Sequence, residues 1–304
     1  MRGLADFIMA GRIQAVTAAV GFAVLALFLP PVALLSGAAV VLVTLRLGLA
    51  AGASVALLSG LALTILGWVM AGVPQLGLLF ALGQWLAPLL FAELLRRTVS
   101  WRLTLQALLL LTLGLLLLAQ LLWPEMTATW REALAEGMAP LLAEGGMPPA
   151  QVDEVLDRLA ELMSAVLAVA LMLGTAFMLV IGRYWQAALY NPGGFGEEFR
   201  ALRLGLWPAG LVIGLVLGML LLDSRLLGQL ALVTAAMFLL QGLALAHGLA
   251  RLYKWHMGWM VALYVLLLLP PFSTYAVAML TAFGVIDCFA DFRARAGAGA
   301  RGNE

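Results

Sequence analysis

The sequence predicts an all-α fold: a polytopic bundle of eight to ten transmembrane helices that carries an acidic, helical extracytoplasmic loop. Three observations predict it. Hydrophobic residues make up 64% of the 304 residues and charged residues only 11%, whereas soluble domains are about half apolar and about a quarter charged. The mean hydropathy is +1.06. Apolar segments also follow one another along almost the whole chain, as in a protein that crosses the bilayer repeatedly.

Ten apolar segments are expected to be helical, in a single integral membrane domain over 1–304. Their ranges are 13–29, 32–45, 47–71, 75–95, 103–123, 162–182, 204–222, 226–250, 257–269 and 272–290. The first is interpreted as a retained span rather than a cleaved signal peptide. Two of them, 32–45 and 257–269, are short, and each adjoins a proline pair that interrupts a helix. Because these two could be hairpin partners or re-entrant segments, the expected count is eight to ten.

The distribution of basic residues predicts the orientation. With a cytoplasmic N-terminus, only three of the 17 Lys and Arg residues fall outside: Arg131, Arg158 and Arg225. The others lie at inner ends and inner loops, as the positive-inside rule requires. We therefore predict a multi-pass protein of a bacterial inner membrane, with the lipid bilayer as its first partner and both termini in the cytoplasm.

Region 124–161 is the longest hydrophilic stretch, and the orientation places it outside the cytoplasm. Its acidic residues are Glu125, Glu132, Glu136, Glu144, Asp153, Glu154, Asp157 and Glu161. Apolar residues recur at helical spacing from Val152 to Leu159, which predicts an amphipathic helix that runs into the sixth segment. Two interpretations stay open: a helical extension on the outer rim, or a lid over an outward-facing cavity.

Region 183–203 is predicted to be a cytoplasmic elbow. Asn191-Pro192-Gly193-Gly194 is a strong turn signal, and the acidic pair Glu197–Glu198 favours a helix start just after it. A glycine-rich turn before a helix can bind phosphate. Here no Gly-Lys-Ser/Thr sequence accompanies it, and two glutamates at the helix start would repel an anion. The region is thus expected to be a structural elbow or a partner-docking loop.

Two stretches resemble the YybS-like family. They are the turn Asn191-Pro192-Gly193-Gly194-Phe195, followed by Glu198-Phe199-Arg200-Ala-Leu-Arg203, and the C-terminal run from Phe283 to Arg293. The resemblance covers about residues 10–295. The family consists of predicted bacterial membrane proteins with a domain of unknown function, and it is similar to the substrate-binding S components of energy-coupling-factor transporters. The resemblance implies a helical bundle around a small-molecule site that docks on a separate membrane coupling subunit and ATPases, although this chain is longer than a typical S component.

Asp287 and Asp291 are four residues apart, on one predicted helical face at the inner end of the last segment. A carboxylate at membrane depth needs a partner. We expect one of them to face an arginine from Arg183, Arg200, Arg203 or Arg251, so that the elbow and the C-terminal segment touch. Structural ion pairing and a functional contact both remain open. The candidate binding or partner-contact residues are Asn191, Pro192, Gly193, Gly194, Phe195, Glu198, Arg200, Arg203, Asp287, Asp291 and Arg293.

Small residues at intervals of four predict close helix packing, either within the chain or against another subunit. They are Gly48, Gly52, Ala56 and Gly60, then Gly210, Gly214 and Gly218, with a lesser ladder at Ala15, Ala19 and Ala23. In S components an alanine ladder on the first span is a docking surface, so the resemblance gives the last set a second interpretation.

The remaining polar residues argue against catalysis. The sequence holds no His-Glu-x-x-His, Gly-x-Ser-x-Gly or Walker motif, and Cys288 is its one cysteine. With a net charge of +1, nothing suggests nucleic acid. Polar residues within the spans are mainly amides that bond helices together or contact a ligand, namely Gln84, Gln106, Gln120, Gln229 and Gln241.

These features predict a protein that is not an enzyme and needs no cofactor or metal. The leading hypothesis is a substrate-binding or transport-accessory subunit that depends on partners for energy. The alternative is a structural or assembly factor of the cell envelope that acts through protein or lipid contacts. The small-molecule substrate, if one exists, is not identified by the sequence.

Overall fold

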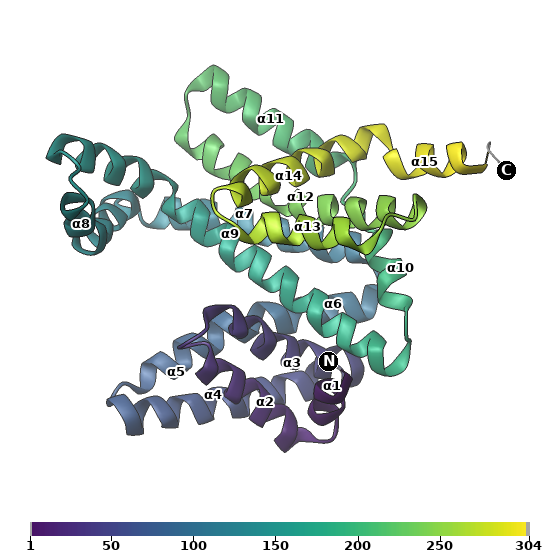
Figure 1. Ribbon diagram of the computed structural model, residues 1–304. Helices are drawn as coiled ribbons and strands as arrows, with labels where there is room; N and C mark the ends of the chain where they lie inside the picture. Colours follow the sequence, from purple (N-terminus) through teal and green to yellow (C-terminus); the bar gives the residue numbers. More distant parts are fainter. Residues whose placement is uncertain (1, 302–304) are drawn as a thin grey trace. The chain divides into compact units, whose positions relative to one another are not determined.

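The structure, a computed structural model, describes residues 2–301, and the regular elements of that range are all helical (Figure 1). The all-α prediction is confirmed for this range. The first half contains α1 (Arg2–Met9), α2 (Arg12–Leu25), η1 (Pro30–Val32), α3 (Ala33–Leu47), α4 (Leu49–Ala71), α5 (Pro74–Ala81), η2 (Leu82–Leu86), α6 (Ala87–Thr98) and α7 (Trp101–Leu122). The second half contains α8 (Met126–Glu144), α9 (Pro149–Tyr190), α10 (Gly194–Arg200), α11 (Leu206–Leu222), α12 (Arg225–Leu252), α13 (Met257–Leu268), α14 (Phe272–Ala290) and α15 (Phe292–Arg301).

Seven helical segments of the described residues are long and apolar enough to cross a membrane: Pro30–Leu47, Leu49–Ala71, Gly77–Thr98, Trp101–Leu122, Pro149–Tyr190, Arg225–Leu252 and Phe272–Ala290. Three further apolar helices are shorter: Arg12–Leu25, Leu206–Leu222 and Met257–Leu268. Together they match the ten predicted segments. The short segment 32–45 gains length because the turn at Pro30–Val32 leads directly into α3. How many of the ten cross the bilayer stays a prediction.

The chain forms two compact units. Unit 1 comprises Met1–Leu105 and Leu173–Leu202, and unit 2 comprises Gln106–Met172 and Arg203–Glu304. Helices α7 and α9 contribute residues to both. Two compact helical units can belong to one membrane domain, so the single-domain prediction stays a prediction.

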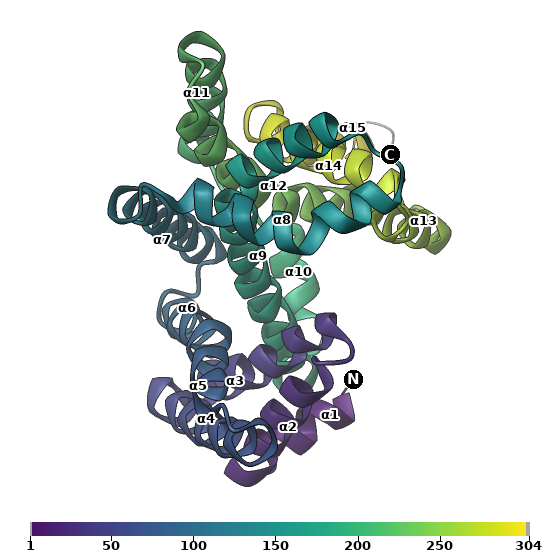
Figure 2. The same cartoon turned by 90° about the vertical axis from the view of Figure 1, so that its left-hand side faces the viewer.

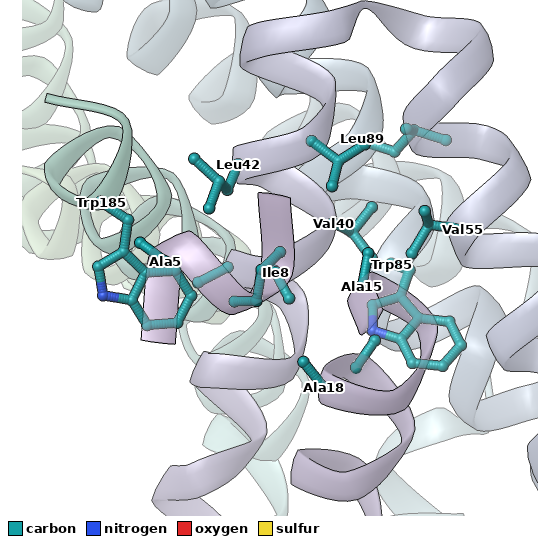
Figure 3. Close-up of a cluster of buried hydrophobic side chains, with 14 of the residues drawn as sticks. Ala5, Ile8, Ala15, Ala18, Val40, Leu42, Val55, Trp85, Leu89 and Trp185 are labelled. Atoms are coloured by element: carbon teal, nitrogen blue, oxygen red, sulfur yellow. The ribbon is translucent and has the colours of Figure 1, made fainter. Parts of the chain in front are cut away.

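The core of unit 1 forms where small side chains on α2 let it lie close to α3 and α4 (Figures 2 and 3). Ala15, Ala19 and Ala23 are all buried. The alanine ladder is therefore occupied by packing within the unit and is not an open docking surface. Ser36 on α3 fixes this layer, because its hydroxyl donates to the carbonyl of Ala19 at 2.7 Å and accepts from the indole N–H of Trp85 at 3.1 Å.

The first glycine ladder divides into two roles. A Cβ added to Gly52 would collide with the Thr44 side chain, and one added to Gly60 would lie 3.0 Å from the Ala81 Cβ. These two glycines pack as predicted. Gly48 instead has φ +92° in the turn between α3 and α4, a left-handed conformation that glycine adopts without strain.

The second ladder corrects the prediction. Apart from the backbone of their own helix and their chain neighbours, no described residue lies within 4 Å of a Cβ added to Gly210 or Gly214, so packing against another helix of the chain is wrong for these two. Only Gly218 has a close neighbour, the Leu227 side chain at 3.0 Å. The physical reason is that a run of small residues fixes one face of a helix but does not determine whether another helix covers that face.

The core of unit 2 is α12, the most buried of the long apolar helices, which packs on α11 and α14. Its closest approach involves Gly242 on α12 and Gly284 on α14. A Cβ on Gly242 would overlap the Leu280 backbone, and one on Gly284 would overlap the Phe238 carbonyl. This glycine pair, which sequence spacing did not single out, allows the two backbones to touch.

Region 124–161 forms α8, a turn at Gly145–Gly146, and the first part of α9, which continues unbroken to Tyr190 (Figure 2). The predicted amphipathic helix is confirmed: Val152 and Leu156 are buried, and the intervening charged residues are exposed. Arg131 of α8 bonds to Asp153 at 2.8 Å and to Asp157 at 2.6 Å, which joins α8 to α9. The extracytoplasmic location of this hairpin stays a prediction.

Candidate functional site

Residues 183–190 of the predicted elbow are the last residues of α9, and the turn of the elbow follows them. After Tyr190, the residues Asn191, Pro192 and Gly193 are exposed, and Gly193 has φ +91°. Gly194 also needs its small size, because an added Cβ would collide with the Asn191 side chain. Helix α10 then begins at Gly194. The predicted turn followed by a helix is confirmed.

An ion pair and an aromatic cluster hold α10 against α7 and α9. The Arg183 guanidinium of α9 donates twice to the Glu198 carboxylate, and the Trp101 indole N–H donates to the same carboxylate at 3.3 Å. Phe195 lies edge-on to Trp101 and to Tyr184, with ring centroids 6.4 and 6.0 Å apart. The sequence offers Arg183 as one of four alternative partners for the C-terminal aspartates, and the structure pairs it instead with Glu198, one turn into α10.

A cavity of about 270 Å³ adjoins this ion pair. Its lining comes from the last turns of α3 and α6, the start of α7, the end of α9, and α10: Leu45, Leu95, Arg96, Val99, Trp101, Arg183, Gln186 and Glu198. The sequence had assigned only Glu198 of these residues to a candidate site. No local pattern would have joined the rest, since they come from three separate stretches of the chain, at 45, 95–101 and 183–186.

A second cluster lies in unit 2 around Asp287, which is fully buried. Its carboxylate accepts from Arg293 at 2.6 Å and from the Gln241 amide at 3.3 Å. Gln241 in turn accepts the backbone N–H of Leu204 at 2.7 Å. One buried carboxylate thus connects α14, α12 and the segment just before α11, and its charge is matched by Arg293.

Asp291 forms a separate pair with Arg203, which confirms that the end of the elbow touches the C-terminal segment. This pair lies outside the apolar spans. The Arg203 guanidinium, helped by the Ala294 backbone N–H, lowers the pKa of Asp291 from its ordinary 3.8 to about 2. The same pairing raises the pKa of Arg203.

The candidate residues therefore fall into two clusters, one in each unit. The turn residues 191–195, together with Glu198 and Arg200, belong to unit 1, whereas Arg203, Asp287, Asp291 and Arg293 belong to unit 2.

A polar cavity of about 180 Å³ in unit 2 is the third feature. It is lined by Gln120, Thr127, Glu161, Arg225, Leu226 and Gln229, which come from the end of α7 and from α8, α9 and α12. The two amides bond to each other at 2.8 Å, and Arg225 pairs with Glu161 at 3.0 Å. We call this the amide pocket. The sequence had identified both amides but not the ion pair beside them.

The other three amides join chain segments. Gln84 donates to the Ala33 carbonyl and Gln106 to the Leu204 carbonyl, each at 2.5 Å. Gln241 belongs to the Asp287 cluster. These three side chains act as bonds between segments, which is one of the two roles the sequence left open for them.

Comparison of the chain with protein-family models, with curated proteins and with solved structures finds no match.

Proposed function

We propose that this protein is a multi-pass membrane protein that binds a small polar molecule in the amide pocket and works as the substrate-binding or accessory subunit of a transporter. The amide pocket carries the proposal. It combines two amides, a hydroxyl and an oppositely charged pair, which is the set of donors and acceptors that orients a small polar ligand.

The predicted topology supports the proposal. In that orientation the pocket lies at the extracytoplasmic ends of α7 and α12, where a molecule from outside would arrive first. The chain has no nucleotide-binding motif, so the energy would come from a separate coupling subunit and ATPase. The resemblance to the YybS-like family points to the same arrangement.

The test is purification from native membranes in a mild detergent, followed by mass spectrometry of retained small molecules and of copurified proteins. We expect a small polar molecule to be retained by the wild type and lost from Arg225→Gln. Arg158→Gln is the matched control, because the Arg158 side chain is about as exposed as that of Arg225 and pairs with Glu154, and neither Arg158 nor Glu154 lines the pocket. A membrane ATPase in the wild-type sample supports transport.

A structural or assembly factor of the cell envelope is the second candidate. The bonds that Gln84, Gln106 and Gln241 form between segments favour it, because a packed scaffold uses its polar groups in this way. Absence of both a retained molecule and an ATPase, with reproducible recovery of envelope proteins, would favour this second function over the first.

A further inference from the structure

The cavity beside the Arg183–Glu198 pair carries an inference that is independent of the amide pocket. It lies in unit 1, where helix ends converge, and one side of its lining is apolar: Leu45, Leu95 and Val99. The other side is polar and includes two guanidinium groups, those of Arg96 and Arg183, against one carboxylate, that of Glu198. The charged part of the lining is therefore positive overall.

The two arginines are held in place by different helices. Arg183 on α9 is 18% exposed and is fixed by Glu198 and by the Gln186 side chain. Arg96 on α6 gives its Nε and one terminal nitrogen to Glu93, each at 2.8 Å. Its other terminal nitrogen, Nη1, has no hydrogen-bond partner among the described residues. A guanidinium with free N–H donors at a cavity wall can bind an anion without breaking an existing hydrogen bond.

We propose that this cavity binds the phosphate of an anionic amphiphile, with the phosphate against Arg96 and Arg183 and the apolar part along Leu45, Leu95 and Val99. Phosphate fits better than carboxylate because it offers more oxygens to the remaining N–H donors of two guanidinium groups that come from different helices. A volume of about 270 Å³ is slightly below the range of about 300–1,000 Å³ for pockets that enclose a whole drug-sized ligand, so a head group fits.

Such a phosphate has two possible sources, a phospholipid head group or a free phosphate. Basic pockets between membrane helices commonly recognise lipid head groups. Leu47, two residues after the lining residue Leu45, is exposed and would then lie along the lipid.

The experiment measures binding of three probes to the purified full-length protein in detergent: dihexanoyl-phosphatidylglycerol, dihexanoyl-phosphatidylcholine and inorganic phosphate. We expect phosphatidylglycerol to bind and phosphatidylcholine, whose head group has no net charge, to bind much more weakly. Binding of inorganic phosphate at similar strength would support the site and identify a free phosphate as its source. Equal binding of the two lipids, or of none of the probes, would overturn the proposal.

Arg96→Gln tests the residue, and Arg97→Gln is its matched control. Both arginines bond to Glu93, so each variant leaves that buried carboxylate one partner, but only Arg96 lines the cavity. We expect Arg96→Gln to weaken phosphatidylglycerol binding by about fivefold, the effect of about one basic residue near an anionic lipid, and Arg97→Gln to leave binding unchanged. An equal loss in both variants would reveal general surface attraction and refute the site.

A second pair of variants keeps the proposal testable if Arg96→Gln fails to fold. Val99 lines the cavity and is 83% exposed, with a positive φ that Asp and Asn tolerate better than most residues. Val99→Asp and Val99→Asn differ only in charge. We expect Val99→Asp to lose phosphatidylglycerol binding and Val99→Asn to keep it, whereas equal binding in the two would contradict the proposal.

Discussion

Asp291 and Asp287 show how far spacing alone predicts a polar contact. The interval of four predicted a shared helical face, but α14 ends at Ala290 and Asp291 has φ +45°. The turn redirects the second carboxylate towards Arg203, whereas Asp287 stays inside against Arg293 and Gln241. The sequence could predict that both aspartates have partners, because a carboxylate at membrane depth needs one, but not which partners, because that depends on where the helix stops.

The lowered pKa of Asp291 has a consequence for stability. A carboxyl whose pKa is lower in the folded state stabilises the fold above its ordinary pKa of 3.8, and that contribution is lost as the pH falls towards about 2. We therefore expect Asp291→Asn to lower the unfolding temperature in detergent at pH 7. The difference in unfolding temperature between this variant and the wild type should shrink as the pH falls from about 4 to about 2.

Two controls separate the ion pair from other effects of this substitution. Asp223→Asn changes an exposed carboxylate at another helix end and should leave the unfolding temperature at pH 7 nearly unchanged. Arg203→Gln made on top of Asp291→Asn should cost much less than Arg203→Gln alone, because the partner is already missing. Additive losses would show that the two side chains are not coupled.

At the scale of helices, the contact between α12 and α14 involves backbone rather than side chains. A methyl group on Gly242 would lie 2.6 Å from the Leu280 carbonyl carbon, and a neighbouring backbone cannot rotate away as a side chain can. We expect Gly242→Ala to destabilise the protein by about 1–3 kcal/mol, the usual cost of overpacking. Equilibrium unfolding in mixed detergent micelles measures this change in the free energy of unfolding.

Gly214→Ala on α11 is the matched control. It makes the same chemical change in another apolar helix, where no described residue lies within 4 Å of the new methyl group. We expect it to be neutral or slightly stabilising, because alanine favours a helix over glycine. A loss as large as that of Gly242→Ala would show that the α12–α14 contact is not the cause.

Helix positions were largely predictable and helix partners were not. Apolar runs and proline pairs mark where helices begin and end, because both act through local chemistry. The predicted segment 75–95 nonetheless contains a π-helical turn at Leu82–Leu86, which no local signal announced. Its residues Gln84 and Trp85 bond to α3, through the Ala33 carbonyl and the Ser36 hydroxyl, and such a turn forms when contacts with other helices outweigh regular helix geometry.

At the scale of the whole molecule, both cavities are built by residues that are far apart in the sequence. The amide pocket draws on four helices of unit 2, and the cavity beside the Arg183–Glu198 pair on five helices that contribute to unit 1. Single residues such as Gln120 and Glu198 stood out in the sequence because they are polar among apolar neighbours. The cavities themselves depend on which helix ends meet, and a single sequence carries little information about that.

The orientation in the membrane determines which cavity faces which compartment, and it can be tested directly. Cys288 is first replaced by alanine, since it is the one cysteine of the chain. Single cysteines are then placed at the exposed positions Glu136 on α8 and Glu197 on α10. The excess of arginine at predicted inner loops leads us to expect that an impermeant thiol reagent, added to intact cells, labels the first cysteine and not the second. Both should react once the membrane is permeabilised, which controls for accessibility. Labelling of Glu197→Cys alone in intact cells would reverse the orientation and place the amide pocket on the cytoplasmic side, where it could not receive a molecule from outside.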